Sequence, residues 1–173
     1  LNLRNTDGIG NYDFLDIDSD EDGIPDNIEG LPTAGYLLPT LVDADGDGLM
    51  NPYDNLPAGF SGSGILVYDH DADGTPDYRD SDTDADGVID RVEGNDLNFN
   101  AMPDDNVTLT GVDTDGDGLD NRFDNDNAST KSTSQYMGNG GTTSGEIPPG
   151  SITTVQHSAI AAFGCPTERD WRC

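Results

Sequence analysis

The sequence predicts an irregular, mostly coil fold: an elongated array of tandem acidic loops with few short strands and no conventional hydrophobic core. Three observations predict it. The 173 residues contain 35 acidic and 7 basic side chains, which gives a formal net charge of -28. Thirty of the acids are aspartate, which favours turns, and only five are glutamate. These aspartates recur in the pattern DxDxDGxxD.

Apolar residues are too few for an ordinary core. Leucine, isoleucine, valine and phenylalanine together make up 34 of the 173 residues. A chain with so little apolar surface and so much self-repulsion is expected to be disordered, because burial cannot offset the loss of backbone entropy. Bound cations would change that balance.

The clearest pattern lies in residues 69–93, where two twelve-residue acidic loops follow one another with only Ser81 between them. Each has oxygen-bearing side chains at loop positions 1, 3, 5, 9 and 12 and a glycine at position 6, while position 7 offers its main-chain carbonyl. Calcium takes six to eight oxygen ligands and is bound by this spacing. We call these loops the central pair. Their predicted ligands are Asp69, Asp71, Asp73, Thr75, Asp77 and Asp80, followed by Asp82, Asp84, Asp86, Val88, Asp90 and Glu93.

The central pair is not expected to form EF-hands. An EF-hand needs a helix on each side of its loop, and a single residue between the loops leaves no room for one. Pro76, at position 8, also removes the backbone donor that paired EF-hand loops would use. We therefore expect the two loops to stack directly on each other.

Three more complete loops share this spacing. A single DxDxDG sequence can be a solvated acidic turn, but composition alone predicts roughly 0.1 chance matches, against the five complete loops that occur. The predicted ligands are Asp18, Asp20, Asp22, Ile24, Asp26 and Glu29; Asp43, Asp45, Asp47, Leu49, Asn51 and Asp54; and Asp113, Asp115, Asp117, Leu119, Asn121 and Asp124.

Two further segments match the pattern incompletely. In residues 96–107, Ala101 replaces the glycine and Val107 occupies position 12, so full occupancy is not expected. Near the N-terminus, the pattern indicates a partial loop at Asn5, Asp7, Gly8 and Asn11. Its first ligand lies upstream or is absent. Whether either segment holds an ion is left open.

The loops belong to a larger repeat, with offsets of 64 residues between Asp18 and Asp82 and 70 residues between Asp43 and Asp113. Repeats of this kind predict an elongated array in which each unit contacts its neighbours. The spacers at 31–42 and 56–68 are broken by proline and glycine. Short strands are expected at residues 65–68 and 107–112.

Composition divides the chain into three parts. Residues 1–126 hold the whole net charge and the tandem repeats, 127–151 form a Ser/Thr/Gly-rich linker, and 152–173 form a C-terminal segment. Within that segment, residues 152–163 suit a strand or an amphipathic helix equally well. Cys165 and Cys173 are expected to form a disulfide if the protein is secreted and to be free thiols if it is cytosolic.

Tandem DxDxDGxxD loops at a 13-residue step, without helices, resemble thrombospondin type 3 repeats. The succession DFLDIDSDEDGIPDNIEG, TAGY and VDADGDGL is similar to the version in very large Bacteroidetes cell-surface adhesins, including flavobacterial gliding-motility adhesins. The ending GCPTERDWRC is similar to the region ahead of their C-terminal sorting domains, which act in type IX secretion. The vertebrate repeats carry stapling cysteines that residues 1–126 lack.

This resemblance implies a secreted cell-surface protein, part of something longer, whose irregular chain wraps about five to ten calcium ions because adjacent loops share ligands. The expected function is a calcium-rigidified stalk for cell adhesion. The alternative is a calcium-dependent, dockerin-like interaction module. Enzyme activity is not expected, because no catalytic constellation stands apart from the calcium loops.

Expected partners are calcium and neighbouring domains of the same long chain or other surface proteins. The negative charge argues against nucleic acid, and the absence of a long apolar run argues against direct membrane insertion. Self-assembly of copies is left open.

Overall fold

The computed structural model describes residues 2–32, 37, 40, 42–56, 64–94, 106–124 and 172. The linker at 127–151, the conformation of residues 152–163, the proposed disulfide between Cys165 and Cys173, and most of the incomplete loop at 96–107 lie outside these ranges.

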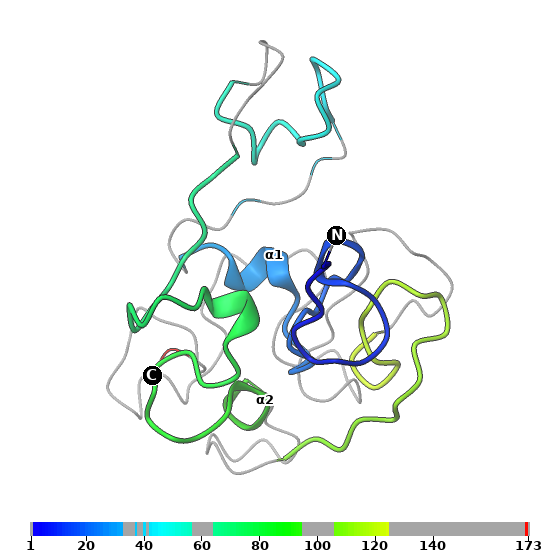
Figure 1. The fold of residues 1–173 in the computed structure, drawn as a ribbon, viewed down its shortest axis with the longest axis vertical. Coiled ribbons are helices and arrows are strands. Elements are labelled where there is room, and N and C mark those ends of the chain that lie inside the picture. The colour runs from blue at the N-terminus through cyan, green and yellow to red at the C-terminus, as the bar shows by residue number, and fades with distance from the viewer. Residues whose placement is uncertain are drawn as a thin grey trace.

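Four short helices occur in the described residues, and each forms the end of an acidic loop. They are the 3-10 helix η1 (Asp13–Leu15), the α-helix α1 (Asp26–Glu29), the 3-10 helix η3 (Asp77–Arg79) and the α-helix α2 (Asp90–Glu93). The α-helices end at Glu29 and Glu93, and each is followed by a glycine, Gly30 and Gly94. Apart from Asp124 and Arg172, the other described residues form turns, bends and irregular chain (Figure 1), which confirms the predicted mostly irregular fold.

The two expected short strands are absent from the described residues. At 107–112 the backbone donors of Thr110 and Gly111 bond to the carboxylate of Asp120, at 3.2 and 2.7 Å, instead of to a neighbouring strand. At 65–68, Leu66 and Val67 are exposed, and Tyr68 donates its N–H to the Gly30 carbonyl at 3.1 Å. A side-chain acceptor at one segment and a single backbone hydrogen bond at the other thus replace the ladder that a strand needs.

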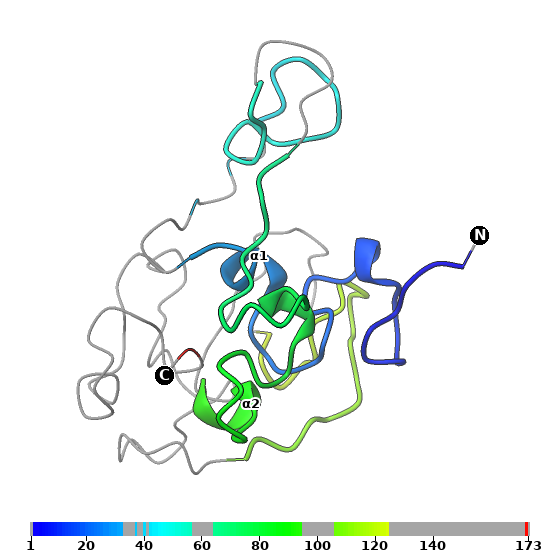
Figure 2. The same cartoon turned by 60° about the vertical axis from the view of Figure 1, so that its left-hand side comes forward.

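Loops distant in the sequence pack against one another, which departs from the expected elongated array. Loop 113–124 lies beside the N-terminal loops (Figures 1 and 2). The Ile17 N–H donates to the Asp117 carbonyl at 3.0 Å, and the Asn11 side chain donates to the Gly116 carbonyl at 3.0 Å. The helix α1 contacts η3. Loop 43–54 projects from this group in both views.

A small apolar cluster joins the packed loops. Val107, Leu119 and Phe123 are buried, with Ile17 and Leu109 partly buried against them. Three buried side chains contribute only several kcal/mol of transfer free energy, at roughly 1.5–3 kcal/mol each. This cluster positions the loops but does not replace an ordinary core. Within the described part of the chain, no helix is long and apolar enough to cross a membrane.

Candidate metal centres

One backbone hydrogen bond closes each of the five complete loops. The N–H at position 9 donates to the carbonyl of the residue just before position 1, over distances of 2.7 to 3.1 Å. The donor–acceptor pairs are Asp26 to Ile17, Asn51 to Val42, Asp77 to Tyr68, Asp90 to Ser81, and Asn121 to Val112. Positions 1 to 8 therefore curl into a ring whose side chains at alternate positions can face one centre.

Two residues in every complete loop adopt a left-handed backbone conformation. The position-6 glycines have φ values from 94° to 104°, a region that glycine adopts without steric cost. Position 4 is left-handed as well and holds Glu21, Gly46, Ala72, Ala85 and Gly116, with φ between 58° and 78°. The sequence pattern did not indicate this second turn, because three of these residues are not glycine.

The carboxylates at positions 1, 3 and 5 converge. In at least four loops their oxygens lie within 4.8 Å of one another, at Asp18–Asp20–Asp22, Asp43–Asp45–Asp47, Asp69–Asp71–Asp73 and Asp82–Asp84–Asp86. Backbone donors fix the end carboxylates of each set. The position-1 carboxylate accepts the N–H of the position-6 glycine, and the position-5 carboxylate accepts the position-7 N–H, as Asp22 does from Ile24 at 2.7 Å.

Several second oxygens of these carboxylates are buried and have no hydrogen-bond partner. Examples are Asp22 Oδ2, Asp45 Oδ2 and Asp69 Oδ1. At position 12 the same holds for both oxygens of Glu29, for Asp54 Oδ2 and for Glu93 Oε2. Buried carboxylate oxygens without a donor are costly unless a cation is bound, so this arrangement suits hard divalent ions such as calcium.

The position-9 side chain clamps each loop. It accepts the N–H of position 2 at 2.7 to 3.0 Å in all five, for example Ser19 to Asp26 and Thr83 to Asp90. Ser19 and Thr83 also donate their hydroxyl groups to these carboxylates. The predicted ligand role of position 9 remains a prediction. In EF-hand loops this position often acts through a water molecule, which the clamp would permit here.

Burial and like charge raise the pKa of the carboxylates around loop 18–29. The pKa values of Asp18, Asp20, Asp22 and Glu29 lie well above their ordinary ranges, first because burial penalises the charged form and then because of neighbouring carboxylates. Without a cation these groups favour protons, and a divalent ion supplies the alternative positive partner.

The central pair shows the same tendency at its second loop. Burial raises the pKa of Asp90 to about 8 and that of Glu93 to about 9. Loop 43–54 differs, since its Asp43 is exposed and the Gly48 N–H lowers the pKa of that carboxyl. The five loops therefore do not offer equivalent environments to an ion.

The N-terminal partial loop has a register that sequence reasoning missed. Thr6 donates to Asp13 at 2.8 Å, and the Asp13 N–H donates to the Arg4 carbonyl at 3.1 Å, which are the bonds of positions 2 and 9. Position 1 is therefore Asn5, neither upstream nor absent, and position 12 is Asp16. Ile9 at position 5 obscured the pattern. We call loops 5–16 and 18–29 the N-terminal pair, which repeats the one-residue junction of the central pair.

This first loop is poorer in carboxylates than the others. Its Asn5 side chain donates to the carbonyls of Ile9 and Asn11, at 2.9 and 2.7 Å. The Asn11 carbonyl occupies position 7, which in a calcium loop faces the ion. The Asn5 amide group thus occupies part of the space that a cation would take.

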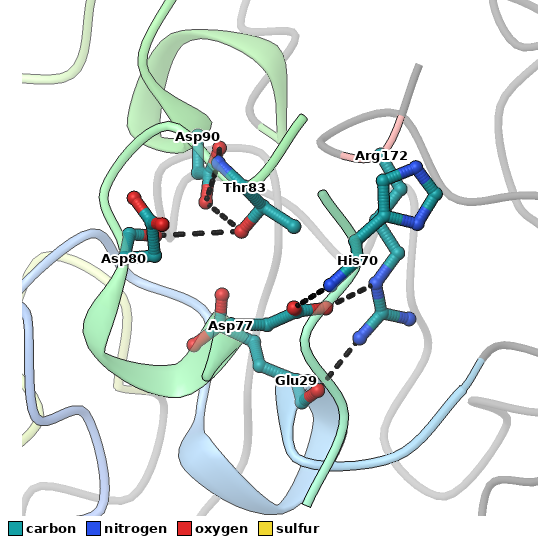
Figure 3. Close-up of polar contacts among 7 residues, drawn as sticks. All are labelled: Glu29, His70, Asp77, Asp80, Thr83, Asp90 and Arg172. Carbon is teal, nitrogen blue, oxygen red and sulfur yellow. Dashed lines mark hydrogen bonds and ion pairs between the residues drawn. The ribbon is translucent and has the colours of Figure 1, made fainter. Parts of the chain in front are cut away.

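Arg172 is a functional candidate that the sequence did not single out. Its guanidinium group donates to Asp77 Oδ2 at 2.7 Å and to the Glu29 main-chain carbonyl at 2.6 Å (Figure 3). It also lies over the Tyr68 ring, 4.8 Å from the centroid. Arg172 is buried, and its side chain contacts both loop pairs, at Glu29 and at Asp77. No local spacing could have indicated this contact.

Comparisons with known proteins add no identification. The chain matched no protein-family model, and a search of curated proteins found no match. The assignment of these clusters as centres able to hold metal ions, compatible with calcium, thus depends on the geometry described above.

Proposed function

We propose that this chain is a calcium-binding structural segment, an extracellular stalk or spacer of a bacterial surface adhesin or filament. The observation that supports it best is the repeated centre: converging carboxylates fixed by backbone donors, with buried second oxygens left without partners. Because each loop contributes several negative charges and little apolar surface, bound calcium would supply most of the free energy that orders the chain.

The packing of the loops modifies the kind of stalk we propose. Because loop 113–124 contacts the N-terminal pair, the stalk unit that we propose is a compact group of loops instead of a straight rod. Calcium would then set the spacing between the domains that flank such a unit, and chelation would lengthen it. Surface location, gliding motility and type IX secretion belong to this proposal through the resemblance alone.

The alternative, a calcium-dependent dockerin-like module, requires a helix after each loop to form its binding face. The helices α1 and α2 are four residues long and each ends at a glycine. This observation favours the structural proposal over the interaction module.

Metal content per chain, measured together with small-angle scattering in calcium and after metal removal, tests the proposal. We expect about five or more ions per chain, and a large increase in the radius of gyration on their removal. A chain that binds no calcium, or whose dimensions do not depend on calcium, would exclude the stalk as proposed. Magnesium at equal concentration is the control, because its small, octahedral shell suits these loops poorly.

A further inference from the structure

One carboxylate cluster joins two loops that are far apart in the sequence. Oxygens of Asp22, Glu29 and Asp90 lie within 4.8 Å of one another. Asp22 and Glu29 occupy positions 5 and 12 of loop 18–29, whereas Asp90 occupies position 9 of loop 82–93. The pattern within a single loop cannot produce this set, and its members are buried, with exposed fractions of 2%, 0% and 0%.

Glu29 supplies an independent indication that a ligand belongs here. It is fully buried, yet neither of its carboxylate oxygens has a hydrogen-bond partner. The Glu29 atom that accepts a hydrogen bond from Arg172 is the main-chain carbonyl oxygen. Asp22 Oδ2 is also buried without a partner. Unpaired carboxylates in such a place cost several kcal/mol each, unless a cation lies between them.

Asp90 reaches this cluster because its own loop holds it firmly. Its carboxylate accepts the Thr83 N–H at 3.0 Å and the Thr83 hydroxyl group at 2.5 Å (Figure 3). These bonds fix the side chain, and each carboxylate oxygen retains capacity for a further interaction. The clamp residue of one loop is thereby presented to the ligands of another.

We propose that the cation bound by loop 18–29 is a cross-link, with Asp90 from loop 82–93 as a ligand beside Asp22 and Glu29. Calcium accepts six to eight oxygens, so an added carboxylate completes a shell that one loop leaves open. Binding at this centre fastens the N-terminal pair to the central pair. The inference rests on the proposed calcium function, but it concerns which residues share an ion.

A double-mutant cycle on the full chain tests the shared ion. Glu29→Gln and Asp90→Asn each remove one charge and keep the side-chain shape. Asn51 and Asn121 already occupy position 9 in sister loops, where they accept the position-2 N–H, so Asp90→Asn should preserve the clamp. Calcium titration followed by the Gly23 amide resonance reports loop 18–29, and the Gly87 amide reports loop 82–93.

Each single variant should weaken calcium binding at Gly23 by roughly tenfold or more, and the double variant by clearly less than the product, because both changes act on one ion. The reference cycle pairs Glu29→Gln with Glu93→Gln, which changes position 12 of the other loop. The effects of these two variants on calcium affinity should multiply, because they act on different ions.

Equal coupling in the two cycles, or no effect of Asp90→Asn at Gly23, would overturn the cross-link. Either result would leave calcium binding by separate loops intact, whereas a wild-type chain without calcium-dependent shifts would refute the proposed function itself.

Discussion

The Arg172 guanidinium group and the Asp77 carboxylate form a buried ion pair, with 2.7 Å between Nε and Oδ2 and exposed side-chain fractions of 0% and 1%. The same carboxylate accepts the His70 N–H at 2.7 Å, which is the position-9 clamp of the first loop of the central pair. A residue near the C-terminus is thus held by a side chain that also shapes a metal centre, and loss of either partner should affect both.

Arg172→Ala is expected to destabilise the calcium-loaded chain by about 3–5 kcal/mol, since it leaves the Asp77 charge buried without its partner. Adding Asp77→Asn should restore part of the loss, because asparagine keeps the clamp and removes the unpaired charge. Denaturant unfolding in saturating calcium measures both. A double variant less stable than Arg172→Ala would show that the pair is not coupled as described.

Calcium removal should unfold the described loops together. Their carboxylates repel one another, and the apolar cluster at Val107, Leu119 and Phe123 is too small to hold them alone. Circular dichroism and hydrodynamic radius, measured after dialysis against chelator, should both change. A radius equal to that in calcium would mean that packing among the loops suffices without ions.

The pH dependence should have opposite signs with and without calcium. In the ion-free fold, burial raises the pKa of Asp90 to about 8 and of Glu93 to about 9, from ordinary values of 3.8 and 4.5. A raised pKa means that the folded state binds more protons than the unfolded state. The contribution of these two carboxyl groups to the stability of the ion-free fold is therefore complete below about pH 4. That contribution is lost as pH rises towards 8 or 9.

Calcium requires the deprotonated carboxylates, so its affinity should increase over the same range. We expect metal-free protein to be more compact at pH 5 than at pH 8, and calcium-loaded protein to melt at a higher temperature at pH 8. Scattering and thermal unfolding at these two pH values check the signs. Metal-free protein that gains stability with increasing pH would contradict the burial that raises these pKa values.

Two glycines with similar backbone angles allow a matched comparison. Gly23 and Gly74 both occupy position 6, with φ of 94° and 101°. A Cβ atom on Gly74 would meet no heavy atom within 4 Å, but one on Gly23 would lie 2.5 Å from the Phe123 ring. Gly74→Ala should cost about 1–2 kcal/mol for the left-handed backbone, and Gly23→Ala clearly more.

Unfolding free energies in calcium measure this difference. Because the extra cost arises from the aromatic ring, Phe123→Leu should reduce the gap between the two alanine variants. Equal costs for Gly23→Ala and Gly74→Ala would indicate that loop 113–124 does not lie against loop 18–29 in solution.

The sequence predicted what is local in this fold and missed what is distant. Ligand spacing and the position-6 turn follow from twelve consecutive residues, so the pattern DxDxDG was sufficient for five loops. The N-terminal loop escaped because Ile9 interrupts its aspartates and Asn5 replaces the first one. The register became evident only from the bonds of Thr6 and Asp13.

Distant contacts had no signal of this kind. Nothing in the repeat indicated that Phe123 covers Gly23, that Ile17 bonds to Asp117, or that Arg172 reaches Asp77. A regular repeat favours the expectation of a linear array, since nearest-neighbour contacts are the simplest that a repeat can make. A few apolar and polar side chains, among them Phe123, Asn11 and Arg172, decide which loops meet.

The two tandem pairs share a junction that should couple neighbouring ions. Asp80 Oδ1 accepts the Asp82 N–H at 3.1 Å, and Asp16 Oδ1 accepts the Asp18 N–H at 3.0 Å. Position 12 of one loop thus orients position 1 of the next. An ion that orders Asp80 in loop 69–80 should also order Asp82 in loop 82–93, and by linkage the coupling is reciprocal.

Asp80→Asn removes a charge from the first loop and retains an oxygen that can accept the Asp82 N–H. We expect calcium affinity to fall at both Gly74 and Gly87, whose amides report the two loops, by roughly fivefold or more at the second. Asp54→Asn is the matched control, because position 12 of loop 43–54 is followed by a spacer; it should leave Gly87 unaffected. If Asp80→Asn changes only the Gly74 titration, the two loops bind calcium independently. Neither the hydrogen bond between Asp80 and Asp82 nor the Asp80 charge then couples the two ions.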